Sequence, residues 1–72
     1  MKTIDFALDA GHDVVELNQL LKLAGLVGSG GEGKQRVAEG AVTVDGSVEL
    51  RKTCKIRAGQ VVGFAGVEVR VR

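Results

Sequence analysis

The sequence lacks proline, tryptophan and tyrosine, and it contains only two phenylalanines, one cysteine and one histidine. A single cysteine excludes an internal disulfide and any zinc site that needs several cysteine ligands. No apolar run approaches the roughly 18 residues that a membrane-spanning helix requires. Asp5 interrupts the N-terminal apolar pattern, so we expect no secretory signal peptide. These absences favour a reducing, cytoplasmic environment without membrane contact.

The residues that are present fit one small folded domain. A chain of 72 residues leaves no room for a second domain, so residues 1–72 are predicted to form a single one. Hydrophobic residues make up 44% of the chain, which is too many for a disordered segment. Because a substrate cleft needs more scaffold, we predict a binding module that is not an enzyme. No catalytic residue, metal site or cofactor is expected.

The charges are unevenly distributed along the chain. Residues 1–33 contain two basic and five acidic side chains, a net charge of −3, whereas residues 34–72 contain eight basic and four acidic ones, a net charge of +4. The segment from Arg51 to Arg57 has four cations and no acid. Such a segment is typical of a polyanion-binding surface, but also of a solvated sheet edge whose charges prevent aggregation.

The periodicity of apolar residues predicts an α+β fold with two N-terminal helices packed on a small, mostly antiparallel sheet. Lys2–Leu8 alternates like a half-buried strand, and residues 14–24 repeat apolar side chains along one helical face. We predict that Asp13 is the N-cap of this first helix, with Glu16 in the capping-box position. Gly25 is predicted to end it.

A second helix is predicted to begin after Ser29, whose side chain caps it, with Glu32 in the capping-box position. It should end near Glu39, with Gly40 as the residue that terminates it. The apolar face of this helix is thin and consists of Gly33, Val37 and Ala38. Its glycines are therefore predicted to let the first helix approach closely.

After Gly40, alternating apolar residues predict strands at residues 41–44, 50–57, 61–64 and 67–72. Asp45-Gly46 predicts a tight reversal, with Gly46 at positive φ. A two-residue loop would place Val48 opposite Thr43 and mix the polar and apolar faces. We therefore expect a bulge or a longer loop at this reversal.

A glycine-rich segment, residues 28–34, matches the nucleotide-binding P-loop as far as Lys34. The match fails at Gln35, because a serine or threonine hydroxyl must bind magnesium at that position. An amphipathic helix precedes the segment, whereas a P-loop follows a buried strand. The segment is better explained as a turn into a capped helix, whose free N–H groups could also hold an RNA phosphate.

Cys54 is the second candidate for catalysis. Lys52 and Lys55 flank it and would lower the pKa of its thiol, which makes a thiolate more reactive. A nucleophile also needs a base, and nothing in the sequence brings the single histidine, His12, close to it. We therefore expect Cys54 to be a small, half-buried strand residue.

The scarcity of aromatic residues constrains how a nucleic acid could be bound. Proteins that read single strands stack bases on aromatic side chains. Here Phe6 and Phe64 both fall in apolar alternation and are predicted to belong to the core. Contact with the phosphates and 2′-hydroxyls of folded or duplex RNA is therefore the favoured mode.

Four segments occur in a characteristic order. They are Leu20-Leu21-Lys22-Leu23-Ala24-Gly25, Ser29-Gly30-Gly31-Glu32-Gly33-Lys34, Gly40-Ala41-Val42-Thr43-Val44-Asp45-Gly46 and Ala58-Gly59-Gln60-Val61-Val62-Gly63-Phe64. This arrangement resembles the RNA-binding domain named after ribosomal small-subunit protein four, the S-four domain. That family has a leucine-rich helix, a Ser-x-x-x-Ala-Lys helix entry, a Gly-x-Val-x-Val-[Asn/Asp]-Gly hairpin and a Gly-[Asp/Gln]-x-[Val/Ile] strand entry. The chain is most similar to the small stand-alone bacterial members.

The resemblance implies an S-four-like fold with an αL-type motif that binds structured RNA without catalysis. Ribosomal RNA and the ribosome are the candidate partners, and a monomer is expected. Charge and position together predict the RNA-contacting residues as Lys34, Arg51, Lys52, Lys55, Arg57, Lys22 and Arg36.

An alternative is a small protein-interaction or carrier-like domain that binds no RNA. Val-Asp-Gly-x-Val followed by Ala-Gly-Gln-Val is also similar to small sulfur-carrier folds. Those carriers require a C-terminal Gly-Gly, whereas this sequence ends in Val69-Arg70-Val71-Arg72.

Overall fold

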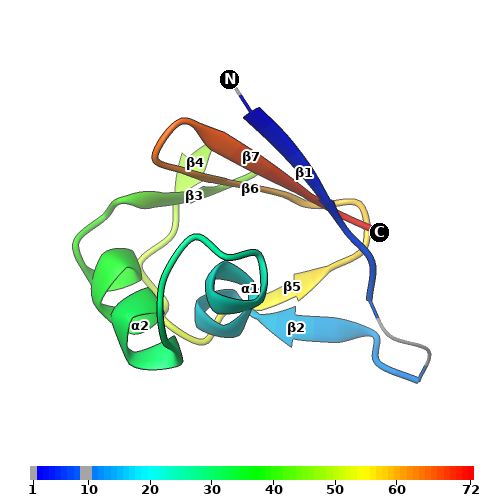
Figure 1. Ribbon diagram of the computed structural model, residues 1–72, viewed down its shortest axis with the longest axis horizontal. Coiled ribbons are helices and arrows are strands. Elements are labelled where there is room, and N and C mark those ends of the chain that lie inside the picture. The colour runs from blue at the N-terminus through cyan, green and yellow to red at the C-terminus, as the bar shows by residue number, and fades with distance from the viewer. Residues whose placement is uncertain (1, 9–10) are drawn as a thin grey trace.

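The computed structural model describes residues 2–8 and 11–72 (Figure 1). In chain order the elements are β1 (Lys2–Phe6), β2 (Val14–Glu16), α1 (Leu17–Leu23), α2 (Gly30–Ala38), β3 (Val42–Val44), β4 (Ser47–Val48), β5 (Lys55–Arg57), β6 (Val61–Phe64) and β7 (Val67–Val71). The predicted α+β class is confirmed. The expected N-terminal position of the helices is wrong, because two strands precede them. Neither helix in the described part of the chain has the length and apolarity needed to cross a membrane.

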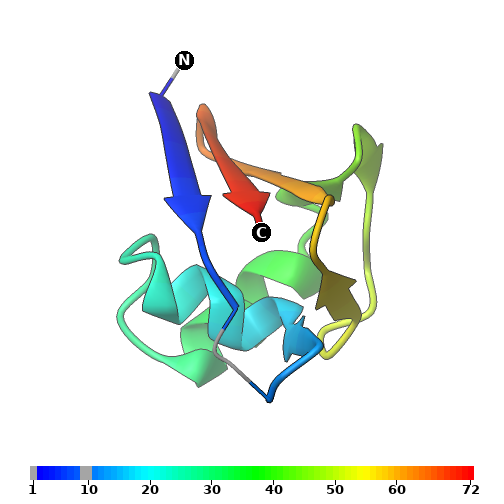
Figure 2. The ribbon, with the colours of Figure 1, turned by 90° about the vertical axis from the view of Figure 1, so that its right-hand side faces the viewer.

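Five strands form one sheet in the order β1-β7-β6-β3-β4, and β2 and β5 form a separate two-stranded antiparallel sheet. Neighbouring strands of the large sheet are antiparallel, except that β1 runs parallel to β7, with Ile4 opposite Val69. Both helices and the small sheet lie on one side of the large sheet (Figure 2). The outer face of the large sheet is therefore left uncovered by other elements.

The hydrophobic core lies between the helices and the inner face of the large sheet. Its completely buried side chains come from both helices, three strands of the large sheet and β5: Leu17, Leu20, Leu21, Val37, Val42, Ile56, Val62 and Val69. Side chains alternate across a strand, so the register that buries the valines turns Thr43, Gly63 and Glu68 to the outer face. Burial of each such aliphatic side chain stabilises the fold by about 1.5–3 kcal/mol.

The first helix begins later than the periodicity predicts. Its first residue is Leu17, and Glu16 occupies the N-cap position without a side-chain hydrogen bond, so the prediction that Asp13 caps this helix is wrong. The β-branched Val14 and Val15 instead pair with β5 as a strand. The predicted end is confirmed, because Gly25 adopts a left-handed conformation with φ +78.

Ser29 caps the second helix as predicted, but the reciprocal half of the capping box is wrong, because the Glu32 carboxylate accepts from the N–H of Gly28 at 2.7 Å and not from that of Ser29. The Ser29 hydroxyl accepts a hydrogen bond from the backbone N–H of Glu32 at 3.1 Å. The helix ends at Ala38, and Gly40 follows with φ +77. Its buried face is narrower than predicted, because Val37 is buried but Ala38 is exposed. The packing of α2 therefore depends on few side chains.

Gly33 brings the two helices into close contact, as the glycine-rich sequence predicts. A Cβ atom at this position would lie 2.6 Å from the backbone oxygen of Asn18 and 3.1 Å from its Cα. Both atoms belong to the backbone of α1 and cannot turn aside. The observed spacing of α1 and α2 therefore requires glycine at position 33.

The β3–β4 reversal is a strict two-residue loop, so the predicted bulge is wrong. Thr43 pairs with Val48, and Asp45 and Gly46 both have positive φ, at 51 and 87. This is the primed turn that Asp-Gly favours. Placing polar and apolar side chains on the same face costs little stability here, because Val48 lies on a two-residue edge strand and remains 59% exposed.

Replacing Gly46 by valine should lower the free energy of unfolding by at least about 1 kcal/mol, because a β-branched residue is strained at positive φ. Gly46→Asn is the matched control and should lose less, because asparagine tolerates the left-handed region. Thermal unfolding of both variants measures the difference. An unchanged melting temperature for Gly46→Val would contradict the turn assignment.

Candidate nucleic-acid interface

An irregular segment, residues 49–54, joins β4 to β5 and runs past the start of α1 (Figure 1). The strand predicted over residues 50–57 is therefore wrong except at Lys55–Arg57. The N–H of Leu17 donates to the carbonyl of Cys54 at 2.9 Å, and that of Asn18 to the carbonyl of Lys52 at 3.3 Å. The first N–H groups of a helix lack partners within it. The segment therefore caps α1 with its own backbone and is held against the helix.

Four of the predicted RNA-contacting cations line one open hollow of about 700 Å³. They are Lys34 from α2 and Arg51, Lys52 and Lys55 from the segment and β5. We call this the basic hollow; Leu50, Thr53 and Cys54 complete its lining. Lys34 directly follows Gly33, so the close approach of the two helices places it beside the segment that α1 holds.

Two of these cations already have acidic partners. The Arg51 guanidinium donates from Nε to Oε2 of Glu49 at 3.0 Å and from Nη2 to Oε1 at 3.1 Å. These hydrogen bonds lower the pKa of Glu49 to about 2, so its carboxylate stays charged well into the acid range. Lys55 Nζ lies 3.1 Å from Oε2 of Glu16. Lys34 and Lys52 form no ion pair within residues 2–8 and 11–72.

The other predicted contact residues lie outside the basic hollow. Arg36 pairs with Glu39 at 2.8 Å and Glu32 at 3.8 Å, and the hydrogen bond to Glu39 raises the pKa of its guanidinium. Lys22 in the last turn of α1 and Arg57 on β5 are both exposed. Their role in binding stays a prediction.

Cys54 does not have the electrostatic environment expected of a reactive thiol. Burial raises the pKa of its thiol, and the carboxylate of Glu49 raises it further. Its Sγ lies 3.6 Å from Oε1 of Glu49 and 3.6 Å from Nη2 of Arg51. The predicted half-buried position of Cys54 is confirmed, but Cys54 lies just before β5 and not in a strand. In the part of the chain that the structure describes, no group of three or more histidine, cysteine, aspartate or glutamate side chains could hold a metal ion.

Sequence reasoning missed the two acids that pair with the hollow's cations. Glu49 could have been found, since it precedes Arg51 by two residues and a short loop brings such side chains together. Glu16 could not, because it meets Lys55 only through the pairing of β2 with β5. Periodicity had assigned that strand to the first helix.

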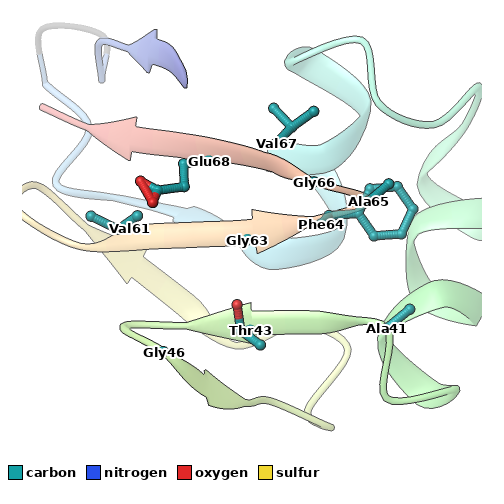
Figure 3. Close-up of a pocket in the computed structure, with 10 residues that line it drawn as sticks. All are labelled: Ala41, Thr43, Gly46, Val61, Gly63, Phe64, Ala65, Gly66, Val67 and Glu68. Atoms are coloured by element: carbon teal, nitrogen blue, oxygen red, sulfur yellow. The ribbon is translucent and has the colours of Figure 1, made fainter. Parts of the chain in front are cut away.

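A second hollow, of about 340 Å³, lies on the outer face of the large sheet. Figure 3 shows Thr43, Gly63 and Glu68 side by side on β3, β6 and β7, with Ala65 and Gly66 at the adjoining turn. Glu68 is the charged residue of its lining. This lining contains one carboxylate and no cation, so it offers no charged partner to a phosphate.

The hollow, the capped helices and the Asp-Gly hairpin all lie within residues 8–72, which the S4 domain family model matches. The chain belongs to the S4 domain family. This confirms the predicted family. The chain is 58% identical over 60 residues to the "Putative RNA-binding protein YbcJ" of Escherichia coli K12, covering 83% of this chain and 86% of that protein. It has the same identity and coverage with YbcJ of Shigella flexneri.

The fold also matches a solved S4-type structure. The solution structure of Escherichia coli YbcJ aligns with a TM-score of 0.73 and 52% identity, covering 99% of this chain and 89% of that one. That structure is described as revealing an αL motif involved in RNA binding. The predicted similarity to small stand-alone members of the S4 family is confirmed.

Proposed function

We propose that this S4 domain protein, as one domain over residues 1–72, binds structured RNA through the basic hollow and catalyses no reaction. The observation that carries the proposal is that Lys34 lines the same surface as Arg51, Lys52 and Lys55, although it lies far from them in the sequence. Clustered cations release counterions when they neutralise phosphates, which is the main source of affinity for nucleic acids. The RNA-binding names given to the YbcJ relatives support the same function.

Lys34 and Lys52 are the primary phosphate contacts in this proposal, because no acid of the described chain neutralises them. Arg51 and Lys55 exchange a carboxylate for a phosphate when RNA binds. The exposed Lys55–Glu16 pair contributes only about 0–1 kcal/mol, so its exchange costs little. The exchange at Arg51 costs more, because its bidentate partner Glu49 is only 18% exposed. Phe6 and Phe64 both pack against the core, which leaves backbone contact with helical RNA as the main mode of binding.

Ribosomal RNA or the ribosome is the proposed partner, bound in the cytoplasm by a monomer. Ribosomal RNA is the most abundant structured RNA in a cell, and the proposed contacts tolerate many sequences. Crosslinking in cells, followed by sequencing of the bound RNA, identifies the partner. Recovery of messenger RNA without ribosomal RNA would contradict this choice of partner and leave RNA binding itself intact.

We expect the binding of a helical RNA to weaken steeply with salt. If about four phosphates are neutralised, log Kobs should fall against log salt with a slope of roughly −3 to −4. A fluorescence titration at several salt concentrations measures the slope. A slope near zero would contradict the proposal, because phosphate contacts could not then dominate the affinity.

A further inference from the structure

Large hydrophobic side chains are exposed at three positions of the described chain: Leu23, Val48 and Leu50, at 60%, 59% and 60%. Two of them meet. A Cβ atom at Gly40 would lie 3.8 Å from Val48 Cγ1 and 3.8 Å from Leu50 Cδ2. Leu50 also lines the basic hollow. We call these two side chains beside Gly40 the apolar ridge; Leu50 is the member that borders the cations.

We propose that the apolar ridge contacts the face of an unpaired nucleobase while Lys34 and Lys52 hold the adjacent phosphates. The protein then selects RNA helices that carry a bulged nucleotide over uninterrupted duplexes. This inference rests on the proposed function, because it names the class of RNA that the basic hollow takes.

The chemistry of RNA supports this choice of ligand. An uninterrupted helix presents phosphates and ribose hydroxyls, while its base faces are stacked on one another. An exposed leucine beside such a helix would lose contact with water and gain no apolar partner. A bulged base offers an apolar face that Leu50 can cover. The basic hollow is open, so a base that projects from a helix can reach Leu50 while its phosphates lie against the cations.

The composition supports the same conclusion. Aromatic side chains are the usual platforms for bases. This chain has no tryptophan or tyrosine, and both phenylalanines pack against the core. An aliphatic contact at Leu50 is therefore the available means of recognising a base beside the cations. A protein partner is the other candidate occupant, but Lys34 and Lys52, which share the hollow with Leu50 and form no ion pair in the described chain, favour a polyanion.

The test compares three RNAs: an uninterrupted helix, the same helix with one bulged adenosine, and the same bulge with an abasic site. Wild-type protein should bind the bulged adenosine helix about fivefold more tightly than the other two. Leu50→Ala should remove this preference while leaving the slope against salt unchanged. Leu23→Ala is the matched control, because it removes an equally exposed leucine outside the hollow, and it should keep the preference.

Equal affinity of the wild-type protein for all three RNAs would overturn the inference, and a salt slope of −3 to −4 would still support the proposed function. A preference that survives in Leu50→Ala would likewise overturn the assignment of the ridge. Failure of the protein to bind any of the RNAs would instead contradict the proposed function. Melting temperatures of both variants should match that of the wild type, because the two side chains are exposed.

Discussion

Gly33→Ala is expected to lower the free energy of unfolding by about 2 kcal/mol, because the added methyl group meets the backbone of α1. The new Cβ would lie 2.6 Å from the oxygen of Asn18, so the helices would have to move apart. For a domain of this size the melting temperature should fall by roughly 10 °C. Thermal and urea unfolding measure the change. The direction of the change in stability is diagnostic, because replacing glycine by alanine inside a helix normally stabilises the helix by about 1 kcal/mol.

Gly31→Ala is the matched control in the same helix. A Cβ at Gly31 would meet only the Ser29 hydroxyl, at 3.9 Å, which is an ordinary contact. This variant should be as stable as the wild type or more stable. If Gly33→Ala also stabilises the protein, the close contact of α1 and α2 is contradicted.

The double variant Lys34→Ala with Lys52→Ala is expected to weaken RNA binding about 50-fold at about 0.1 M salt. Each phosphate contact contributes a slope of about −0.9, so the loss of two should make the slope shallower by about two. Both side chains are exposed and without ion pairs in the described chain, so the melting temperature should hardly change. Salt titrations of wild type and variant measure both quantities.

Arg70→Ala with Arg72→Ala removes the same net charge elsewhere on the protein. Arg70 lies on β7, and Arg72, just after it, already pairs with Asp5 at 3.1 Å. Neither residue lines the basic hollow. This control should bind RNA within about twofold of the wild type. A larger loss than in the Lys34 and Lys52 variant would place the binding face on the other side of the molecule.

Much of the fold could be predicted from local sequence because the determining interactions are local. The Ser29 cap, the end of α1 at Gly25 and the positive φ of Gly46 each depend on residues within a single turn. The alternation of valines in β7 reports a half-buried strand for the same reason. The family could also be recognised, because its motifs are short and follow in order.

The wrong predictions concern segments whose structure depends on residues far away in the sequence or on their exposure in the folded protein. Val14–Glu16 continues the helical periodicity, but it became a strand because β5 offered its backbone. The alternation of polar and apolar residues predicts a bulge before Val48, because a two-residue loop mixes the two faces. The two-residue loop forms nevertheless, since Val48 lies on an exposed edge strand. The periodicity of apolar residues indicates which side chains are buried, but it does not indicate which backbone groups form hydrogen bonds with another strand.

The sequence by itself determined the S4 family, the α+β class, the capped second helix and the basic composition of the segment around Lys52. Only the tertiary structure decided that Lys34 joins this segment, that Glu16 already neutralises Lys55, and that Leu50 borders the cations. The physical reason is the backbone capping of α1 by residues 52 and 54 together with the close helix contact at Gly33. Both interactions join segments far apart in the chain, and neither leaves a periodic pattern in the sequence.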